Sequence, residues 1–231
     1  MEQQPTAPSR RPSRRERPAK AALSREGIVT VALAIMRAEG LAKITMRRIA
    51  AALDTGAASL YVYVRDTEDL HAQLLDALLA DVVVPEAGDW RQRLKGLIRR
   101  YIDLLFAYPE MARMALSTPA NGPNYLRLVE TLLGLLHAGG IEDGAAALAV
   151  DMLLLYATAD AAEDANWQQT PRAARDMAEL SASLAAADPA EFPHIARLGP
   201  ALLSGGPELR LDWTLDVMLA GARATPRPPP R

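Results

Sequence analysis

Residues 45–67 carry side chains that suit contact with a nucleic acid. The hydroxyl-bearing and basic members are Thr45, Arg47, Arg48, Ser59, Tyr61, Tyr63, Arg65 and Thr67. Arginine can donate two hydrogen bonds to a guanine edge, whereas hydroxyl groups and backbone amides position DNA phosphates. Ala57, Ala58 and Val62 are small, so we expect close approach and apolar contact with thymine methyl groups. The alternatives are ordinary packing for the two tyrosines and a solvated helix face for Arg47 and Arg48.

Two short helices joined by a tight turn are expected to position these side chains. Thr45 can cap the first helix, because its hydroxyl can accept a hydrogen bond from a free amide of the opening turn. Asp54-Thr55-Gly56 then interrupts the helical pattern with residues that suit a left-handed backbone, and a second helix is expected from Ala57 to Val64. The apolar positions expected to face inward are Ile49, Ala50, Leu53, Leu60 and Val64. This pattern predicts a helix-turn-helix, whose second helix can enter the major groove, although other small helical proteins contain similar turns.

Charge is divided unevenly along the chain. Residues 1–65 contain 12 Lys or Arg and 5 Asp or Glu, a net charge of +7, whereas residues 66–231 carry −9. DNA would therefore be attracted to the first part and repelled by the second. Residues 1–21 are rich in Pro, Ser and Arg, so we expect a disordered basic arm. The arm is either a solvated tail or a segment that contacts phosphates or the minor groove.

Composition excludes several classes of site and protein. The chain has 231 residues and no Cys, so disulfides, thiolate zinc sites and Cys nucleophiles are excluded. His71, His137 and His194 are isolated, and no Gly-rich phosphate loop is present. We therefore expect no metal site, no cofactor and no enzymatic activity. The N-terminus has no apolar signal segment and no run of 18 residues lacks polar interruption, which predicts a cytoplasmic protein without membrane association.

Helical periodicity continues through the rest of the chain, and no alternating strand pattern appears. We expect an all-α protein with a three-helix head at 22–82, a boundary at 85–89, a larger helical domain at 86–224 and a disordered tail at 225–231. Residues 188–207 are expected to be mostly loop, because they contain four prolines and three glycines. The longest helix, 141–167, is expected to present one apolar side formed by Leu148, Met152, Leu155, Tyr156 and Ala159.

The layout resembles the tetracycline-repressor (TetR) family of bacterial transcriptional regulators. The head carries the resemblance in Thr45-Met46-Arg47-Arg48-Ile49-Ala50 and in Ser59-Leu60-Tyr61-Val62-Tyr63-Val64, followed by Leu70. The body segments that resemble the family's ligand-binding and dimerisation domain are residues 108–112 (YPEMA), 122–127 (GPNYLR) and 212–219 (DWTLDVML). The chain departs from the family pattern at Thr67, where lysine is usual, and at Asp54, where the turn usually has glycine.

The resemblance implies a homodimer joined by helices near 141–167 and 208–223, a pseudo-palindromic DNA operator and a small-molecule pocket in each body. The effector itself is unknown from the sequence. Flexible Met and amphipathic aromatic residues suit such a pocket, although they equally suit a core: Tyr101, Phe106, Met111, Met114, Tyr125, Met152, Tyr156 and Trp167. Asp160, Glu163 and Asp164 could pair with a cationic ligand, or lie on a solvated face or at the dimer seam. A ligand-released repressor is the favoured function; the alternatives are a regulator whose body binds a protein partner or no ligand, and a transcriptional activator.

Overall fold

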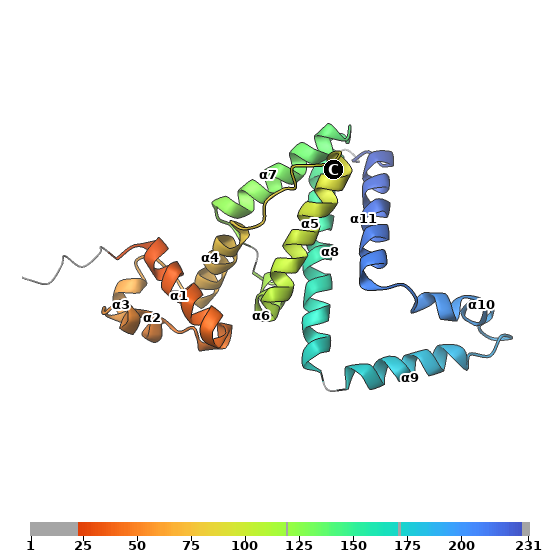
Figure 1. Cartoon of the computed structure of the whole chain (residues 1–231), viewed down its shortest axis with the longest axis horizontal. Helices are drawn as coiled ribbons and strands as arrows, with labels where there is room; N and C mark the ends of the chain where they lie inside the picture. The colour runs from red at the N-terminus through yellow and green to blue at the C-terminus, as the bar shows by residue number, and fades with distance from the viewer. Residues whose placement is uncertain (1–22, 119, 171, 228–231) are drawn as a thin grey trace, which may run out of the picture.

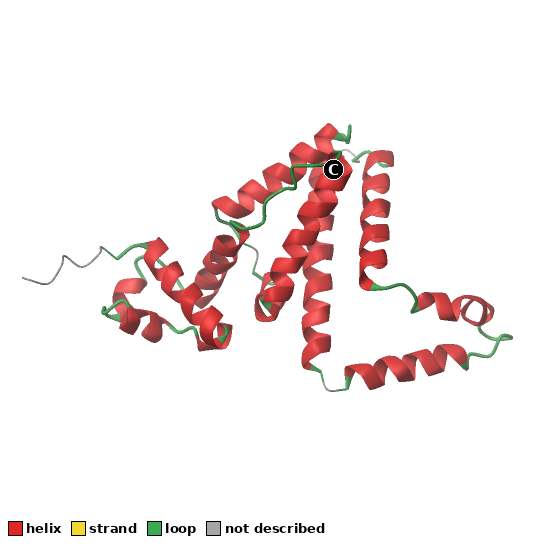
Figure 2. Cartoon of the chain, viewed as in Figure 1, coloured by secondary structure: helices red, strands yellow, loops and turns green. Residues whose placement is uncertain are grey.

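The computed structural model describes residues 23–118, 120–170 and 172–227, and every regular element within them is helical (Figure 2). The expected basic arm and the last residues of the tail lie outside the described residues. A small group of helices at the N-terminus, the head, packs against a larger group, the body, through the last helix of the head (Figure 1). The expected all-α fold is confirmed.

Short helices build the head around a small core. They are α1 (Arg25–Glu39), the 3-10 turn η1 (Leu41–Lys43), α2 (Met46–Ala52), α3 (Ala57–Leu60) and α4 (Thr67–Leu79). Ser24 caps α1 by accepting a hydrogen bond from the Gly27 amide at 3.1 Å. Gly40 ends α1 with a φ of 92°, a backbone conformation that side chains with a Cβ rarely adopt. The fully buried residues of this core include Ile28, Ala32, Ile49, Leu60 and Val64, so α2 and α3 are held against α1.

The body core is arranged around the longest helix, α8 (Asp143–Gln169). The helices that precede it are α5 (Trp90–Ala107), α6 (Pro109–Ala115) and α7 (Pro123–Ala138), and all three pack against α8. The side of α8 that faces them is rich in small buried residues: Ala145, Ala146, Ala149, Ala157, Ala161 and Ala162. Small side chains let these helices approach one another closely, because no long side chain separates their backbones.

The side of α8 that the sequence predicted as its apolar face does not face this core. Leu148, Met152 and Leu155 are 46%, 50% and 60% exposed, whereas Leu153 and Leu154 are buried. Because apolar residues occur on every side of α8, periodicity could not identify which side packs inward. By length and composition the segment Asp143–Trp167 could cross a membrane, but 56% of its most apolar window is buried inside the protein.

The C-terminal helices extend the body. They are α9 (Ala173–Ala185), α10 (Pro193–Leu202) and α11 (Pro207–Ala224). Helix α11 packs against α8 and is tied to α5 by an ion pair of 2.7 Å between Lys95 Nζ and Asp216 Oδ1. Helices α9 and α10 pack against each other and project away from the body (Figure 1). The prediction of loop for 188–207 is wrong where α10 forms, because Pro193 occupies the first helical position, which needs no N–H donor.

Candidate DNA interface and ligand cavities

The turn between α2 and α3 has the expected left-handed residue. Asp54 has a φ of 49°, and the Thr55 amide donates to the Ala50 carbonyl oxygen at 2.9 Å. Helix α3 ends at Leu60 and continues as turns through Tyr63, so the second helix is shorter than the predicted Ala57–Val64. Leu60 and Val64 are fully buried as predicted, and their burial fixes which side of this segment faces outward.

The outward side of the α3 segment is made of small and hydroxyl-bearing residues. Ala58 and Ser59 are exposed, Tyr61 is 54% exposed and Val62 is 80% exposed. Ala57 and Tyr63 are only partly exposed and pack against the head core. The first four residues therefore form an accessible surface without long charged side chains, while Tyr63 combines packing with partial exposure.

The two arginines at the start of α2 have different surroundings. Arg48 forms an ion pair with Glu39 at the end of α1, and its guanidinium Nη1 lies 2.9 Å from Glu39 Oε2. The Glu39 hydrogen bond raises the pKa of Arg48. Within the described residues the exposed Arg47 side chain has no hydrogen bond or ion pair, so its guanidinium remains available to a partner. Thr45 caps α2 as predicted, accepting from the Arg48 amide at 3.2 Å.

Acidic side chains occupy the start of α4. The Asp66 carboxylate accepts a hydrogen bond from the Asp69 amide at 2.8 Å and thereby caps the helix. Asp69 in turn accepts from the Arg65 amide at 2.9 Å; burial raises the pKa of Asp69, but hydrogen bonds from Arg65 and Gln73 lower it overall. Thr67 is exposed at the first position of α4. Asp66 thus satisfies the amide of Asp69 and places negative charge at the start of α4, beside Thr67.

An inner cavity of about 490 Å³ lies between α4 and the core helices of the body. Leu75 and Leu79 of α4 line one side of it, and Val150 and Leu154 of α8 line another. Its buried polar pair is Tyr101 and Thr158, whose hydroxyl oxygens are 2.8 Å apart. Burial raises the pKa of Tyr101, which keeps its hydroxyl neutral. The cavity is thus mostly apolar with a few polar groups, since Tyr125 and Asp151 also line it, and this is a common composition of small-molecule sites.

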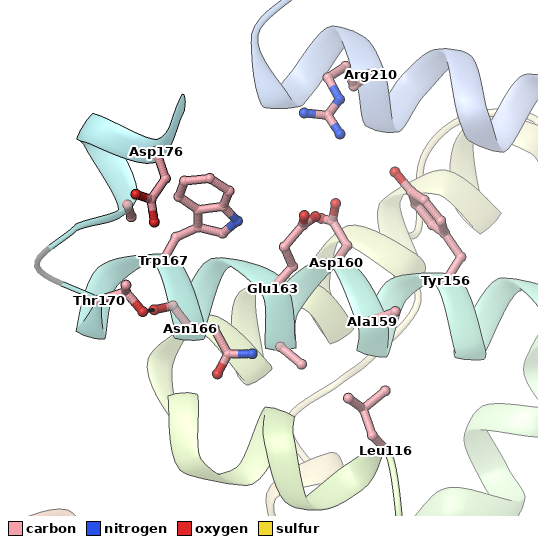
Figure 3. A pocket seen from close by; sticks show the side chains of 12 residues that line it. Leu116, Tyr156, Ala159, Asp160, Glu163, Asn166, Trp167, Thr170, Asp176 and Arg210 are labelled. Atoms are coloured by element: carbon pink, nitrogen blue, oxygen red, sulfur yellow. Dashed lines mark hydrogen bonds between the residues drawn. The ribbon is translucent and has the colours of Figure 1, made fainter. Parts of the chain in front are cut away.

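An outer cavity of about 630 Å³ lies on another side of α8, toward α9 and α11 (Figure 3). Tyr156 and Trp167 contribute aromatic rings, and Asp160 and Glu163 point toward Arg210 of α11 (Figure 3). Burial raises the pKa of Asp160, although the positive charge of Arg210 opposes this shift. Among the described residues, no group of three His, Asp or Glu side chains is placed to hold a metal ion.

The eight side chains predicted for a single pocket are divided among several places. Tyr101 and Tyr125 line the inner cavity, and Tyr156 and Trp167 line the outer one. The remaining four are Phe106 in a smaller cavity beside Trp167, Met111 buried beside α1, Met114 packed on the core and Met152 on the exposed side of α8. Asp160, Glu163 and Asp164 do gather, because all three line the smaller cavity with Phe106.

Several residues of the inner cavity were not singled out by sequence reasoning. Leu75 and Leu79 follow the apolar stripe of α4 and gave no sign of a second role. Thr158 offered a usable signal, because it is a hydroxyl-bearing residue within a long apolar helix. A buried hydroxyl needs a hydrogen-bond partner, and the Tyr101 hydroxyl on the neighbouring helix α5 provides it.

Residues 84–225 match the family described as tetracyclin repressor-like, C-terminal domain. The HTH-type transcriptional repressor DrrR1 of Streptomyces coeruleorubidus is 32% identical over 170 residues, which are 71% of this chain. That match spans 60% of the relative, less than two thirds of its length.

Two solved structures from Streptomyces coelicolor extend over most of the chain. Transcription regulator SCO7704 is 47% identical with a TM-score of 0.77, covering 92% of this chain and 100% of its own. The TetR family protein ActR in complex with actinorhodin is 33% identical with a TM-score of 0.76, covering 88% of this chain and 97% of its own. Head and body are therefore arranged as in known regulators.

Proposed function

The chain belongs to the tetracycline-repressor-like family of transcriptional regulators, and from this premise we propose that it is a homodimeric repressor which a small molecule releases from its operator. Regulators of this family are DNA-binding transcription factors and not enzymes. The repressor would act in the cytoplasm on a pseudo-palindromic operator. Its effector would occupy the inner cavity of each body.

For the DNA contact we propose the outward side of the α3 segment together with α2. The residues are those predicted from the sequence: Thr45, Arg47, Arg48, Ala57, Ala58, Ser59, Tyr61, Tyr63, Arg65 and Thr67. This surface is supported by the exposure of Tyr61 and Val62 and by the Arg47 guanidinium, which has no partner among the residues that the structure describes. Arg48 would act indirectly, since its ion pair with Glu39 fixes α2 against α1.

For the dimer we propose an interface formed by α8 and α11. Leu148, Met152 and Leu155 on α8 and Trp213 and Val217 on α11 are about half exposed or more in the single chain. Large apolar side chains gathered on packed neighbouring helices are typical of a protein–protein interface. In such a dimer the two heads would reach half-sites about one helical turn, roughly 34–36 Å, apart.

The observation that carries the proposed release is that α4 forms part of the inner cavity. Leu75 and Leu79 belong to the helix that joins head to body, and they line the same space as Tyr101 and Thr158. A molecule that fits one orientation of α4 better than another therefore changes the population of head positions, and it lowers DNA affinity by its differential binding.

Mobility shifts on the DNA flanking the gene, with and without actinorhodin as a first probe, test this release. ActR binds actinorhodin in its solved complex, and we expect the compound to weaken the shift of the wild-type chain. Ala147→Trp should fill the inner cavity and leave a DNA complex that resists the compound, because Ala147 lines the cavity without being buried in the core. Ala138→Trp, at the exposed end of α7, is the matched control. Release of Ala147→Trp at the wild-type concentration would count against the inner cavity.

A further inference from the structure

Two helical elements are capped by side chains from the other part of the molecule, one in the head and one in the body. The amide of Leu41, the first residue of η1, donates to Oε2 of Glu110 on α6 at 2.8 Å. The amide of Tyr125, in the first turn of α7, donates to Oδ1 of Asp76 on α4 at 2.8 Å. Neither element receives a cap from its own preceding residue, because those residues are Gly40 and Gly122. The body therefore caps an element of the head, and the head caps a helix of the body.

The Asp76 contact is tightly enclosed. Asp76 is only 7% exposed, and its Oδ2 also accepts a hydrogen bond from Asn124 Nδ2 at 3.2 Å. A Cβ placed on Gly122 would lie 2.3–2.6 Å from the atoms of this carboxylate. The carboxylate thus rests directly on the backbone of Gly122, and a side chain there would displace either the Asp76 carboxylate or the helices that carry the contact.

Helices α1, α4 and α6 lie near one another around Glu110, at one end of the head. Glu110 stands in the first turn of α6, next to the end of α1. Tyr108, just before α6, is hydrogen-bonded to Arg37 of α1 and raises the pKa of that guanidinium. His71 of α4 lies in the electrostatic field of the Glu110 carboxylate. The start of α6 therefore lies against the end of α1, and α6 also packs against α4.

We propose that Asp76 and Glu110 are positioning residues that set the orientation of the head on the body. Two charge-assisted bonds at separate points restrain a rigid unit more than one bond does, and each leaves an amide unpaired when it is removed. In a dimer the same restraint fixes the separation of the two heads. The consequence for DNA rests on the proposed function, whereas the geometric restraint does not.

These caps also connect the inner cavity with the head. Leu75 precedes Asp76 in α4 and lines that cavity, as does Tyr125, whose amide Asp76 holds. A molecule that shifts the backbone of Tyr125 must either lengthen the Asp76 bond or move α4 with α7. Asp76 therefore transmits a change in the cavity to the helix that carries the head.

The distance between the two heads of the free dimer tests the proposal. The chain has no Cys, so Thr30→Cys on the exposed side of α1 introduces a single spin-label site in each head. Pulsed electron paramagnetic resonance then measures the head-to-head distance without DNA or ligand. Gly122→Ala and Glu110→Ala should each shift or broaden the distance distribution.

Matched variants separate positioning from general damage. Gly134→Ala changes the same helix where nothing lies within 4 Å of the added Cβ, so its distances should equal those of the wild type. Glu110→Gln keeps an acceptor oxygen and should restore most of the wild-type distribution. On operator DNA, Glu110→Ala should bind about tenfold more weakly, the factor that corresponds to one charge-assisted hydrogen bond.

Unchanged distances in both Gly122→Ala and Glu110→Ala would overturn the proposal, even if their melting temperatures fall, because the caps would then be only structural. A shift in either variant that its control lacks supports it. Absence of operator binding by the wild-type chain would contradict the proposed function but would leave this distance measurement valid.

Discussion

Head and body stabilise their helices in different ways. In the head, helices begin at capping side chains such as Ser24 and Thr45, and the large apolar residues other than Tyr61 and Val62 of the α3 segment are buried or partly buried. In the body, α8 buries mainly alanines and leaves Leu155 60% exposed, while α11 leaves Trp213 67% exposed. A single copy thus completes the head, whereas the body retains apolar surface that a second copy would cover. DNA recognition and assembly are therefore assigned to separate regions.

A charge placed on the exposed apolar surface of the body should have the largest effect, which is loss of the dimer. Trp213→Glu places a charge on the exposed side of α11, in both copies of a two-fold interface. A buried interface Trp contributes about 2 kcal/mol or more, so two copies should raise the dimer dissociation constant about a thousandfold. Sedimentation equilibrium would then show monomer. Val83→Glu, in the segment between α4 and α5 where the valine is 56% exposed, is the matched control and should remain dimeric. A dimeric Trp213→Glu chain would remove α11 from the interface.

Replacing the two neighbouring arginines of α2 should have different effects on DNA binding and on stability. Arg47→Ala should weaken operator binding by about 1–3 kcal/mol without changing the melting temperature, because the side chain is free for DNA. Arg48→Ala should instead lower the melting temperature slightly, because it removes the exposed pair with Glu39, and it should affect binding less. Fluorescence anisotropy and thermal unfolding measure the two effects. A larger affinity loss for Arg48→Ala would reverse the assignment.

The junction between the regions should give the smallest effect, a pH dependence at His71. Burial lowers the pKa of His71 below 6.5, against the opposing charges of Glu110 and Glu68. Between the folded and unfolded pKa values the unfolded chain binds more protons, so stability should fall as the pH drops through 6.5. The contribution is less than about 1 kcal/mol, since the imidazole remains partly solvated.

Urea unfolding at several pH values measures this term. His71→Gln should flatten the pH dependence, and substitution of the exposed His194 should not. An unaltered pH profile in His71→Gln would show that another group causes the acid sensitivity.

The same contrast explains what the sequence could predict. The cap at Thr45 and the left-handed Asp54 are confirmed, because each depends on neighbours a few residues away. The inward side of α8 and the helix α10 were mispredicted, because they depend on packing against distant segments. The Asp76–Tyr125 bond joins residues 49 positions apart, and one sequence without comparison contains no pattern for such a pair.

The candidate DNA surface could be predicted from a local pattern, whereas the candidate ligand cavity could not. The exposed residues of the α3 segment follow from a local pattern of apolar positions, and Leu60 and Val64 are buried as predicted. The ligand residues were chosen by type, so Tyr101 and Tyr125 reached the inner cavity while Met152 lies on the exposed side of α8. Which side chains share a cavity is decided by how α4 to α8 pack, and residue type does not encode it.

A footprint of the full-length chain on the DNA flanking its gene tests the central claim most directly. The account predicts two protected half-sites about one helical turn apart, roughly 34–36 Å between centres. It predicts that Arg47→Ala weakens the protection of both half-sites together. Arg175→Ala, on the exposed side of α9, should leave this protection unchanged. A single protected half-site, or protection that Arg47→Ala leaves intact, would contradict a dimer that reads DNA through α2 and α3.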